Sequence, residues 1–115
     1  MENRIKTNAQ LSKGKTVENP PGIFRTTLAY NGETMLCHFR MKEGSSIPLH
    51  NHPAVQNGFV IRGKLRFIKK DKPGFIAETG SGYVFASNEP HGAEVLEYSE
   101  VIECFAPVRP EYIDD

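Results

Sequence analysis

The feature that most limits how this chain can fold is that its apolar residues never repeat with a helical period. No segment sustains an apolar period of about 3.6 residues over the roughly ten positions that a helix needs. The apolar residues come instead in short, β-rich runs separated by turn residues. We therefore predict strands at residues 23–30, 34–42, 58–62, 65–70, 75–78, 83–86, 93–98 and 100–105. Short strands at regular spacing are typical of an all-β fold, either an antiparallel sandwich or a barrel.

The first two predicted strands are joined by Asn31-Gly32, a pair typical of a two-residue hairpin turn. Both residues tolerate the positive φ angles that such a turn requires. In the second strand, alternation places Met35, Cys37 and Phe39 on one face, opposite a more mixed face. This strand therefore has one face suited to a core.

The chain has 115 residues, enough for a single domain. Residues 1–22 are polar and end in Pro20-Pro21-Gly22, which favours neither a helix nor a strand ladder. We expect these residues to form a loose N-terminal arm that packs on a partner subunit. Residues 23–115 are expected to form the β-barrel domain.

The charge of the chain is balanced, with 14 basic and 14 acidic residues. No global field attracts nucleic acid or a membrane surface, and no apolar run is long enough to span a bilayer. The first residues are polar and are not followed by the apolar core of a secretory signal. We expect a soluble cytoplasmic protein, in which Cys37 and Cys104 are buried free thiols.

Three of the four histidines fall into a pattern that is typical of a metal site. His50 and His52 lie two residues apart, and side chains two apart on an extended backbone project to the same side. Gln56 returns to that side after the turn at Pro53, and His91 enters a strand after a turn-rich stretch. If the sheet closes on itself, the three histidines and Gln56 meet and bind one metal ion.

A simpler interpretation competes with this one. Two histidines in an HxH pattern are often exposed surface residues, and a glutamine such as Gln56 is common at an exposed strand end. His38 lies outside the pattern, and we interpret it as a strand residue or as a group behind the ligands, not as a ligand.

The glycines that flank the histidines complete a resemblance to the cupin superfamily of RmlC-like proteins. The residues that resemble the first cupin motif are Gly44, His50, His52, Gln56 and Gly63, with glutamine in place of the usual glutamate. The second motif is matched by Gly80 and His91, with Ala86 where it has proline and Asn88 where it has glycine. The resemblance covers about residues 34–106. It implies a single-domain cupin, an antiparallel double-stranded β-helix or jelly-roll barrel.

The predicted ligands are all neutral, so the ion keeps its full dipositive charge and is a strong Lewis acid. They support a higher oxidation state less well than a carboxylate-containing iron site does. The set therefore favours non-redox polarisation of a carbonyl, hydroxyl or carboxylate over dioxygen chemistry. One divalent ion per chain is expected, and zinc, nickel, manganese, cobalt and iron all fit.

The last predicted strand supplies candidate catalytic and substrate-binding residues. By alternation Glu103 and Phe105 share a face, and Cys104 points the other way. If that face lines the barrel, Glu103 is an acid/base group and Phe105 an apolar wall. Arg109 then folds over the opening and clamps a carboxylate. The alternative is an exposed edge glutamate and a surface arginine.

These residues, together with Pro107, the stretch 90–94 and the His-x-His-Pro-x-x-Gln run at 50–56, resemble one subgroup of small cupins, the pectin-degradation proteins of the KdgF type. The resemblance implies metal-dependent opening of the ring of a 4,5-unsaturated uronate or a related sugar acid, in carbohydrate metabolism. It implies that Glu103 and Arg109 are catalytic and that Phe105 and Arg109 bind substrate. The family position matched by Glu103 usually holds aspartate, and the added methylene moves the carboxyl.

Two other functions stay open. An iron-dependent dioxygenase is a common use of this barrel, and a non-catalytic module binds a metal or sugar acid without turnover. The expected partner is a small molecule, which the resemblance implies is a carboxylate-bearing sugar derivative. Apolar residues on both faces of the last strand, such as Val101 and Ile102, further predict a homodimer.

Overall fold

The computed structural model describes residues 3–113, so residues 1–2 of the predicted arm and 114–115 of the predicted barrel domain lie outside the described residues. The strands are β1 (Thr16–Glu18), β2 (Ile23–Tyr30), β3 (Met35–Met41), β4 (Ser46–His50), β5 (Val55–Lys69), β6 (Lys72–Glu78), β7 (Gly82–Phe85) and β8 (His91–Ala106). Two short 3-10 helices, η1 (Leu11–Lys13) and η2 (Pro110–Tyr112), precede and follow them. Within residues 3–113, no helix has the length and apolarity needed to cross a membrane.

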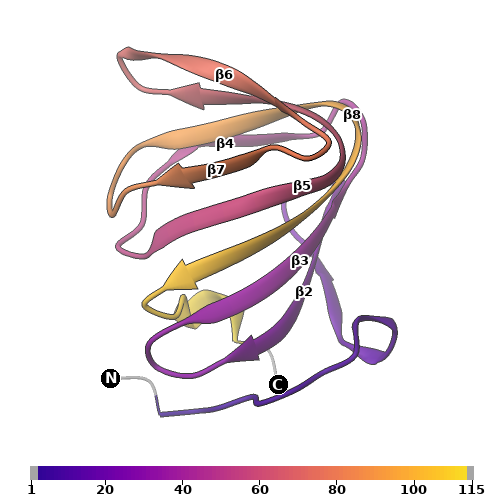
Figure 1. Ribbon diagram of the computed structural model, residues 1–115, viewed down its shortest axis with the longest axis vertical. Helices are drawn as coiled ribbons and strands as arrows, with labels where there is room; N and C mark the ends of the chain where they lie inside the picture. Colours follow the sequence, from indigo (N-terminus) through magenta and orange to yellow (C-terminus); the bar gives the residue numbers. More distant parts are fainter. Residues whose placement is uncertain (1–2, 114–115) are drawn as a thin grey trace.

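The strands form an antiparallel sheet that curls over on itself (Figure 1). The order is β1-β2-β3-β8-β5-β6, and in addition β4 pairs with β8 and β7 pairs with β5. The two long strands, β5 and β8, pair from Val55 opposite Ala106 to Lys69 opposite His91. Because each of them has different neighbours along its two halves, the sheet closes into a jelly-roll barrel, as predicted.

Two pairs of predicted strands are in fact continuous. Residues 58–62 and 65–70 were predicted as separate strands but belong to β5, apart from residue 70, while 93–98 and 100–105 both belong to β8. The interruptions in the sequence pattern mark bends, not strand ends. Gly63 has a φ of 113°, and a Cβ there would collide with Ser99. The register of β5 and β8 shifts around this point, and the Ser99 hydroxyl accepts a hydrogen bond from the Lys64 amide at 3.0 Å.

The predicted two-residue turn at Asn31-Gly32 is wrong. Tyr30 pairs with Met35, so that four residues connect β2 and β3, and neither Asn31 nor Gly32 has a positive φ. The Asn31 side chain builds the loop instead, because its Oδ1 accepts hydrogen bonds from the amides of Glu33 and Thr34 at 2.8 and 3.1 Å.

The N-terminal arm is not loose. β1 pairs with β2 through residues 16–18, and Lys6 forms a bridge with Tyr30 of β2. The arm therefore extends the sheet of its own chain (Figure 1), and its packing on a partner subunit stays a prediction. One prediction about the cysteines is also wrong: Cys37 is buried in the barrel, but Cys104 is exposed on its outer face.

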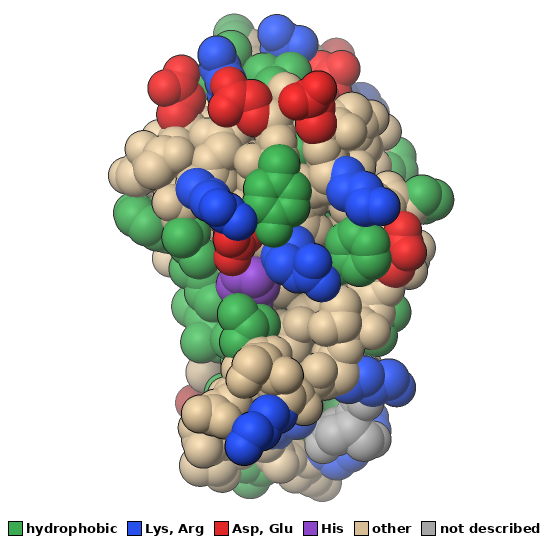
Figure 2. Space-filling model, turned by 90° about the vertical axis from the view of Figure 1, so that its right-hand side faces the viewer, with side chains coloured by type: hydrophobic (Ala, Val, Ile, Leu, Met, Phe, Trp, Pro, Cys, Tyr) green, Lys and Arg blue, Asp and Glu red, His purple; other side chains and the backbone are tan. Residues whose placement is uncertain are grey.

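The core fills the barrel with side chains from both halves of the sheet. The largest fully buried side chains are those of Ile23, Met35, Val60, Leu65, Phe85, Val101 and Phe105. On the surface, basic and acidic side chains lie interspersed over the face seen in Figure 2, as expected from the balanced charge. β4, which carries the first candidate ligand, was not predicted, because Pro48 and a mixed five-residue run give no clear alternation.

Candidate metal centre and adjoining pocket

Three of the four predicted metal ligands come from neighbouring strands, and the fourth comes from the link between two of them. His50 ends β4 and pairs directly with His91, the first residue of β8. Gln56 lies near the start of β5, where it pairs with Phe105 of β8. His52 lies in the short link between β4 and β5. The closed sheet therefore brings together side chains that lie up to 41 residues apart, as the 50 and 91 positions do.

The side chains of the three histidines converge inside the barrel. One ring nitrogen from each of them lies within 4.8 Å of the others. The Oε1 atom of Gln56 lies 3.0 Å from Nε2 of His52 and 3.2 Å from Nε2 of His91. The predicted convergence of the histidines is thus found, and the amide oxygen of Gln56 belongs to the same cluster.

Backbone carbonyls determine which ring nitrogen each histidine presents. The Nδ1 atoms of His50, His52 and His91 lie 2.9, 2.8 and 2.8 Å from the carbonyl oxygens of Pro48, Ala54 and Glu89, respectively. A carbonyl can only accept, so each Nδ1 donates its proton and each neutral ring keeps a lone pair on Nε2. Imidazoles oriented in this way are typical of metal ligands.

This donor set fits a divalent cation. The lone pairs of the imidazoles and the amide oxygen of Gln56 are all acceptors, and acceptors that face one another at about 3 Å repel unless a positive charge lies between them. Burial also lowers the pKa of His52, and it lowers that of His91 to about 4. The rings of His52 and His91 are therefore neutral near pH 7, which is the state that binds metals.

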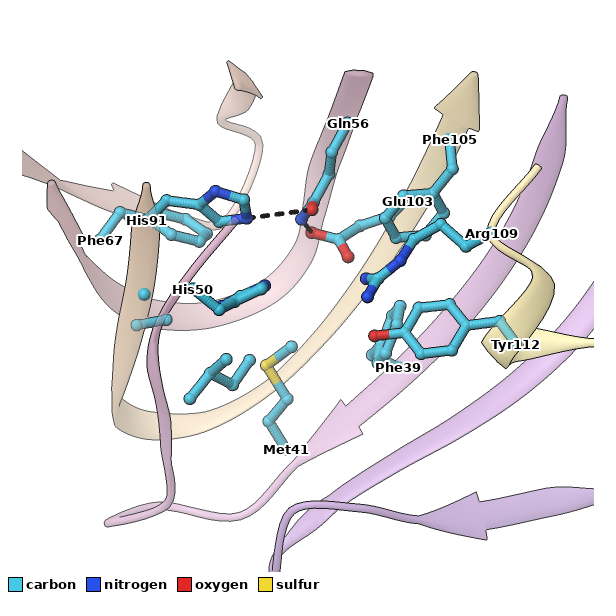
Figure 3. Close-up of a pocket in the computed structure, with 13 residues that line it drawn as sticks. Phe39, Met41, His50, Gln56, Phe67, His91, Glu103, Phe105, Arg109 and Tyr112 are labelled. Atoms are coloured by element: carbon cyan, nitrogen blue, oxygen red, sulfur yellow. Dashed lines mark hydrogen bonds between the residues drawn. The ribbon is translucent and has the colours of Figure 1, made fainter. Parts of the chain in front are cut away.

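Glu103 lies behind the metal centre and is buried. Its Oε2 accepts one hydrogen bond from the Gln56 side-chain amide at 2.7 Å and another from the Tyr83 hydroxyl at 2.6 Å. Burial raises the pKa of Glu103 despite these two donors. In Figure 3, Gln56 lies between His91 and Glu103, and the Glu103 carboxyl group points into the pocket. The predicted inward orientation of Glu103 and Phe105 is therefore correct.

Arg109 follows β8 and turns back over the pocket. Its guanidinium carbon lies 5.3 Å from the centre of the Phe105 ring and 4.1 Å from that of Tyr112. One Arg109 nitrogen lies 3.6 Å from the exposed carboxylate of Glu111. Its Nε is buried and, among the described residues, has no hydrogen-bond partner. A buried unpaired donor that faces a pocket is suited to bind an acceptor on a ligand.

The pocket connects the metal centre to Arg109 (Figure 3) and has a cavity volume of about 40 Å³. It is lined by His50, Gln56, His91, Glu103, Phe105 and Arg109, and also by Phe39, Met41, Ile47, Phe67, Gly92, Ala93 and Tyr112. Sequence analysis identified the polar residues of this set and missed most of the apolar ones. Their inward alternation in β3 and β5 is visible in the sequence, but alternation alone does not tell which inward positions lie beside the histidines.

Two residues of β7 that were missed contact the site. Phe85 stacks on the His91 ring, with ring centres 4.3 Å apart and an angle of 3° between the planes. Tyr83 donates the hydrogen bond to Glu103. His38, in contrast, lies outside the cluster, as predicted, and its Nε2 lies 2.9 Å from a carboxylate oxygen of Glu100.

A closed antiparallel barrel with three histidines converging inside it defines a candidate metal-binding β-barrel. The sequence matches the profile of the cupin domain family over residues 37–102, more than half of the chain. The chain therefore belongs to the cupin family, which confirms the resemblance found in its sequence. No curated protein sequence matched the chain significantly.

Solved structures with the same fold include small cupins of similar length. An RmlC-like cupin from Shewanella frigidimarina matches with a TM-score of 0.88 at 19% identity, over 98% of this chain and 100% of that one. KdgF from Halomonas sp. matches with a TM-score of 0.84 at 24% identity, over 92% and 99% of the two chains. The polyketide cyclase RemF from Streptomyces resistomycificus matches with a TM-score of 0.75 at 17% identity, over 91% and 82%. At these identities the likeness establishes the fold.

Proposed function

We propose that this protein is a metal-dependent enzyme that opens the ring of a 4,5-unsaturated uronate, or of a related sugar acid, without redox chemistry. The observation that carries the proposal is the composition of one pocket. It is lined by His50 and His91, two of the three converging histidines, by the buried carboxyl group of Glu103 and by the guanidinium of Arg109. The structural likeness to KdgF from Halomonas sp. supports the same reading.

In this proposal, His50, His52, Gln56 and His91 hold one divalent ion, which is zinc, nickel, manganese, cobalt or iron. All four ligands are neutral, and the bound ion supplies Lewis acidity to a substrate oxygen. The acceptor atoms that converge in the barrel support this assignment, because their lone pairs suit a cation.

Arg109 binds the carboxylate of the sugar acid, and Phe105 forms an apolar wall beside it. The guanidinium offers paired donors to a carboxylate, and its neighbours in the pocket are mostly aromatic rings, which exclude water. The Arg109 side chain is 11% exposed, so its position is fixed by packing before a substrate arrives.

Glu103 moves the proton. Its Oε2 is engaged by Gln56 and Tyr83, which leaves Oε1 for the substrate. Glu103 takes the proton of the hemiacetal hydroxyl as the bond between that carbon and the ring oxygen breaks. The ring oxygen leaves as an enolate, and Glu103 returns the proton to the double-bonded carbon next to the one that bears this oxygen, so that the enolate becomes a ketone. A carboxyl group with a pKa raised by burial is suited to both steps near neutral pH.

The proposal is tested by following the ultraviolet absorbance of a 4,5-unsaturated uronate. The native protein, loaded with each candidate metal in turn, should remove the absorbance band faster than buffer does. His91→Ala and Glu103→Gln should abolish this acceleration, and Glu100→Gln, on the outer face of the same strand, should keep it. Decay at the buffer rate with every metal would refute the reaction. Oxygen consumption on turnover would favour the dioxygenase alternative instead.

The predicted homodimer and the cytoplasmic location stay predictions. Several large apolar side chains are exposed on the outer face of the barrel, including Phe59 and Val84, which are 46% and 61% exposed. A second copy of the chain would cover such a face. Light scattering at low protein concentration tests the dimer, and the mass of a single chain would contradict it.

A further inference from the structure

Hydrogen bonds behind the metal centre determine which end of the Gln56 amide faces the histidines. The two ends differ in chemistry, because the oxygen accepts hydrogen bonds and the NH₂ group donates them. Left to itself, the amide would turn its NH₂ group toward the lone pairs of His52 and His91, which lie about 3 Å away. In that orientation Gln56 would fill the centre with a donor and would oppose metal binding.

Glu103 prevents this orientation. Its Oε2 lies 2.7 Å from Nε2 of Gln56. If the amide were turned over, its oxygen would face the carboxylate oxygen at the same distance, and two acceptors would repel. The contact requires only that Oε2 accept a hydrogen bond. The orientation of Gln56 is therefore set by a residue that lies 47 positions further along the chain.

Tyr83 and Gly58 hold Glu103 in place. On strand β5, Gly58 pairs with Tyr83 on one side and with Glu103 on the other. A Cβ at residue 58 would lie 2.5 Å from the Tyr83 hydroxyl oxygen, so only glycine lets this hydroxyl reach across β5. The hydroxyl then donates to Oε2 of Glu103 at 2.6 Å. The carboxylate is thus clamped between two donors and is 5% exposed.

We propose that Glu103, clamped by Tyr83, is a positioning residue that keeps the amide oxygen of Gln56 turned toward the histidines, so that a glutamine serves as the fourth metal ligand. The inference rests on the metal site of the proposed function and is independent of the uronate reaction. It also explains why an amide at position 56 suits a carboxylate at position 103. A glutamate at 56 would place two carboxylates in contact, whereas an amide and a carboxylate attract.

The test is the affinity of metal-free protein for Zn²⁺, measured by competition titration, in five forms of the full chain. Glu103→Gln allows Gln56 to turn over and should weaken Zn²⁺ binding by about 10- to 100-fold, the usual effect of removing a group behind a ligand. Tyr83→Phe keeps the contact between Gln56 and Glu103 and should weaken binding less. The double variant Gln56→Glu/Glu103→Gln restores a hydrogen bond of opposite polarity and should recover most of the affinity. Glu100→Gln removes a carboxylate from the outer face of β8 and should bind as the native chain does.

A second readout separates positioning from a general loss of structure. The visible spectrum of bound Co²⁺ reports the ligands around the ion, so Glu103→Gln should change it and Glu100→Gln should not. The inference is overturned if Glu103→Gln binds Zn²⁺ with native affinity, or if the double variant is no better than Glu103→Gln alone. It is equally overturned if the native chain binds no Zn²⁺ or Co²⁺. If Glu103→Gln fails to fold, the Zn²⁺ affinities of the double variant and of Tyr83→Phe, each compared with that of the native chain, test the inference instead. Native metal affinities without uronate turnover would refute the proposed reaction and leave this inference standing.

Discussion

The barrel buries histidines in two places and uses them in opposite ways. His52 and His91 lie inside the barrel and are 5% and 3% exposed, while His38, on the outward side of β3, is 4% exposed. The inner rings donate Nδ1–H to backbone carbonyls and keep Nε2 free for a cation. The Nε2 atom of His38 lies 2.9 Å from a carboxylate oxygen of Glu100, which also pairs with Arg62 at 2.8 Å.

Burial alone therefore does not identify a metal ligand. What differs is which ring nitrogen has a partner and whether that partner is charged. A backbone carbonyl orients a ring and leaves its other nitrogen available, whereas a carboxylate at Nε2 uses the nitrogen that would bind a metal. If this comparison is correct, substitutions in the two places must affect metal binding very differently.

The largest expected difference is between His91→Ala and His38→Ala. The first removes a proposed ligand and should weaken Zn²⁺ binding by more than about 100-fold, beyond the usual effect of changes behind a ligand. The second should leave the affinity unchanged. Isothermal titration of metal-free protein with Zn²⁺ measures both. Equal losses in the two variants would show that the distinction between the two places is wrong.

Metal should also stabilise the fold through the inner histidines only. Zn²⁺ at about 100 times its dissociation constant adds about 2.7 kcal/mol to the free energy of unfolding. For a domain of this size that corresponds to a rise in Tm of roughly 10 °C. Thermal unfolding with Zn²⁺ and with a chelator should give this difference for the native chain and for His38→Ala. The expected difference for His91→Ala is close to zero, and a full rise there would contradict the proposed ligand set.

The sequence predicts features that depend on neighbouring residues better than it predicts features that depend on distant ones. His50 and His52 are recognisable because an HxH pair on an extended backbone points one way. The strand Ile23–Tyr30 was also predicted with its correct bounds, since its apolar run is bounded by turn residues. These features are local, and each can be evaluated within a few residues of the chain.

Contacts between distant residues could not be predicted in the same way. Whether Gln56 presents its oxygen or its NH₂ group depends on Glu103 and Tyr83, and each of these lies on another strand. The sequence pattern does not predict the continuity of β5 and β8, because the bend at Gly63 depends on its close approach to Ser99 and on the register shift between the two strands there. Such features follow from the closure of the barrel, which the pattern of single strands does not specify.

A smaller effect is expected for Phe85→Leu, which leaves every proposed ligand in place. Phe85 is fully buried and stacks on His91. Loss of one aromatic contact costs about 0.5–1.5 kcal/mol, which corresponds to a roughly 2- to 10-fold weaker binding of Zn²⁺ if the stacking orients the ring. Titration with Zn²⁺ measures it, and Phe67→Leu, which removes an aromatic ring that also contacts Phe85, is the matched control. Equal losses in both variants would mean that general packing, not the orientation of His91, is responsible.

The smallest effect is expected on the outer side, for Arg62→Gln. Its salt bridge to Glu100 is short, at 2.8 Å, but the Arg62 side chain is 61% exposed, and an exposed pair of this kind contributes little to stability. Glu100→Gln should cost more, about 1 kcal/mol, because the amide gives the buried ring of His38 a neutral hydrogen-bond partner in place of a charged one. Urea unfolding of metal-free protein measures both, and neither variant should change the affinity for Zn²⁺. A larger loss for Arg62→Gln than for Glu100→Gln would mean that the exposed pair, not the buried histidine, is what Glu100 stabilises.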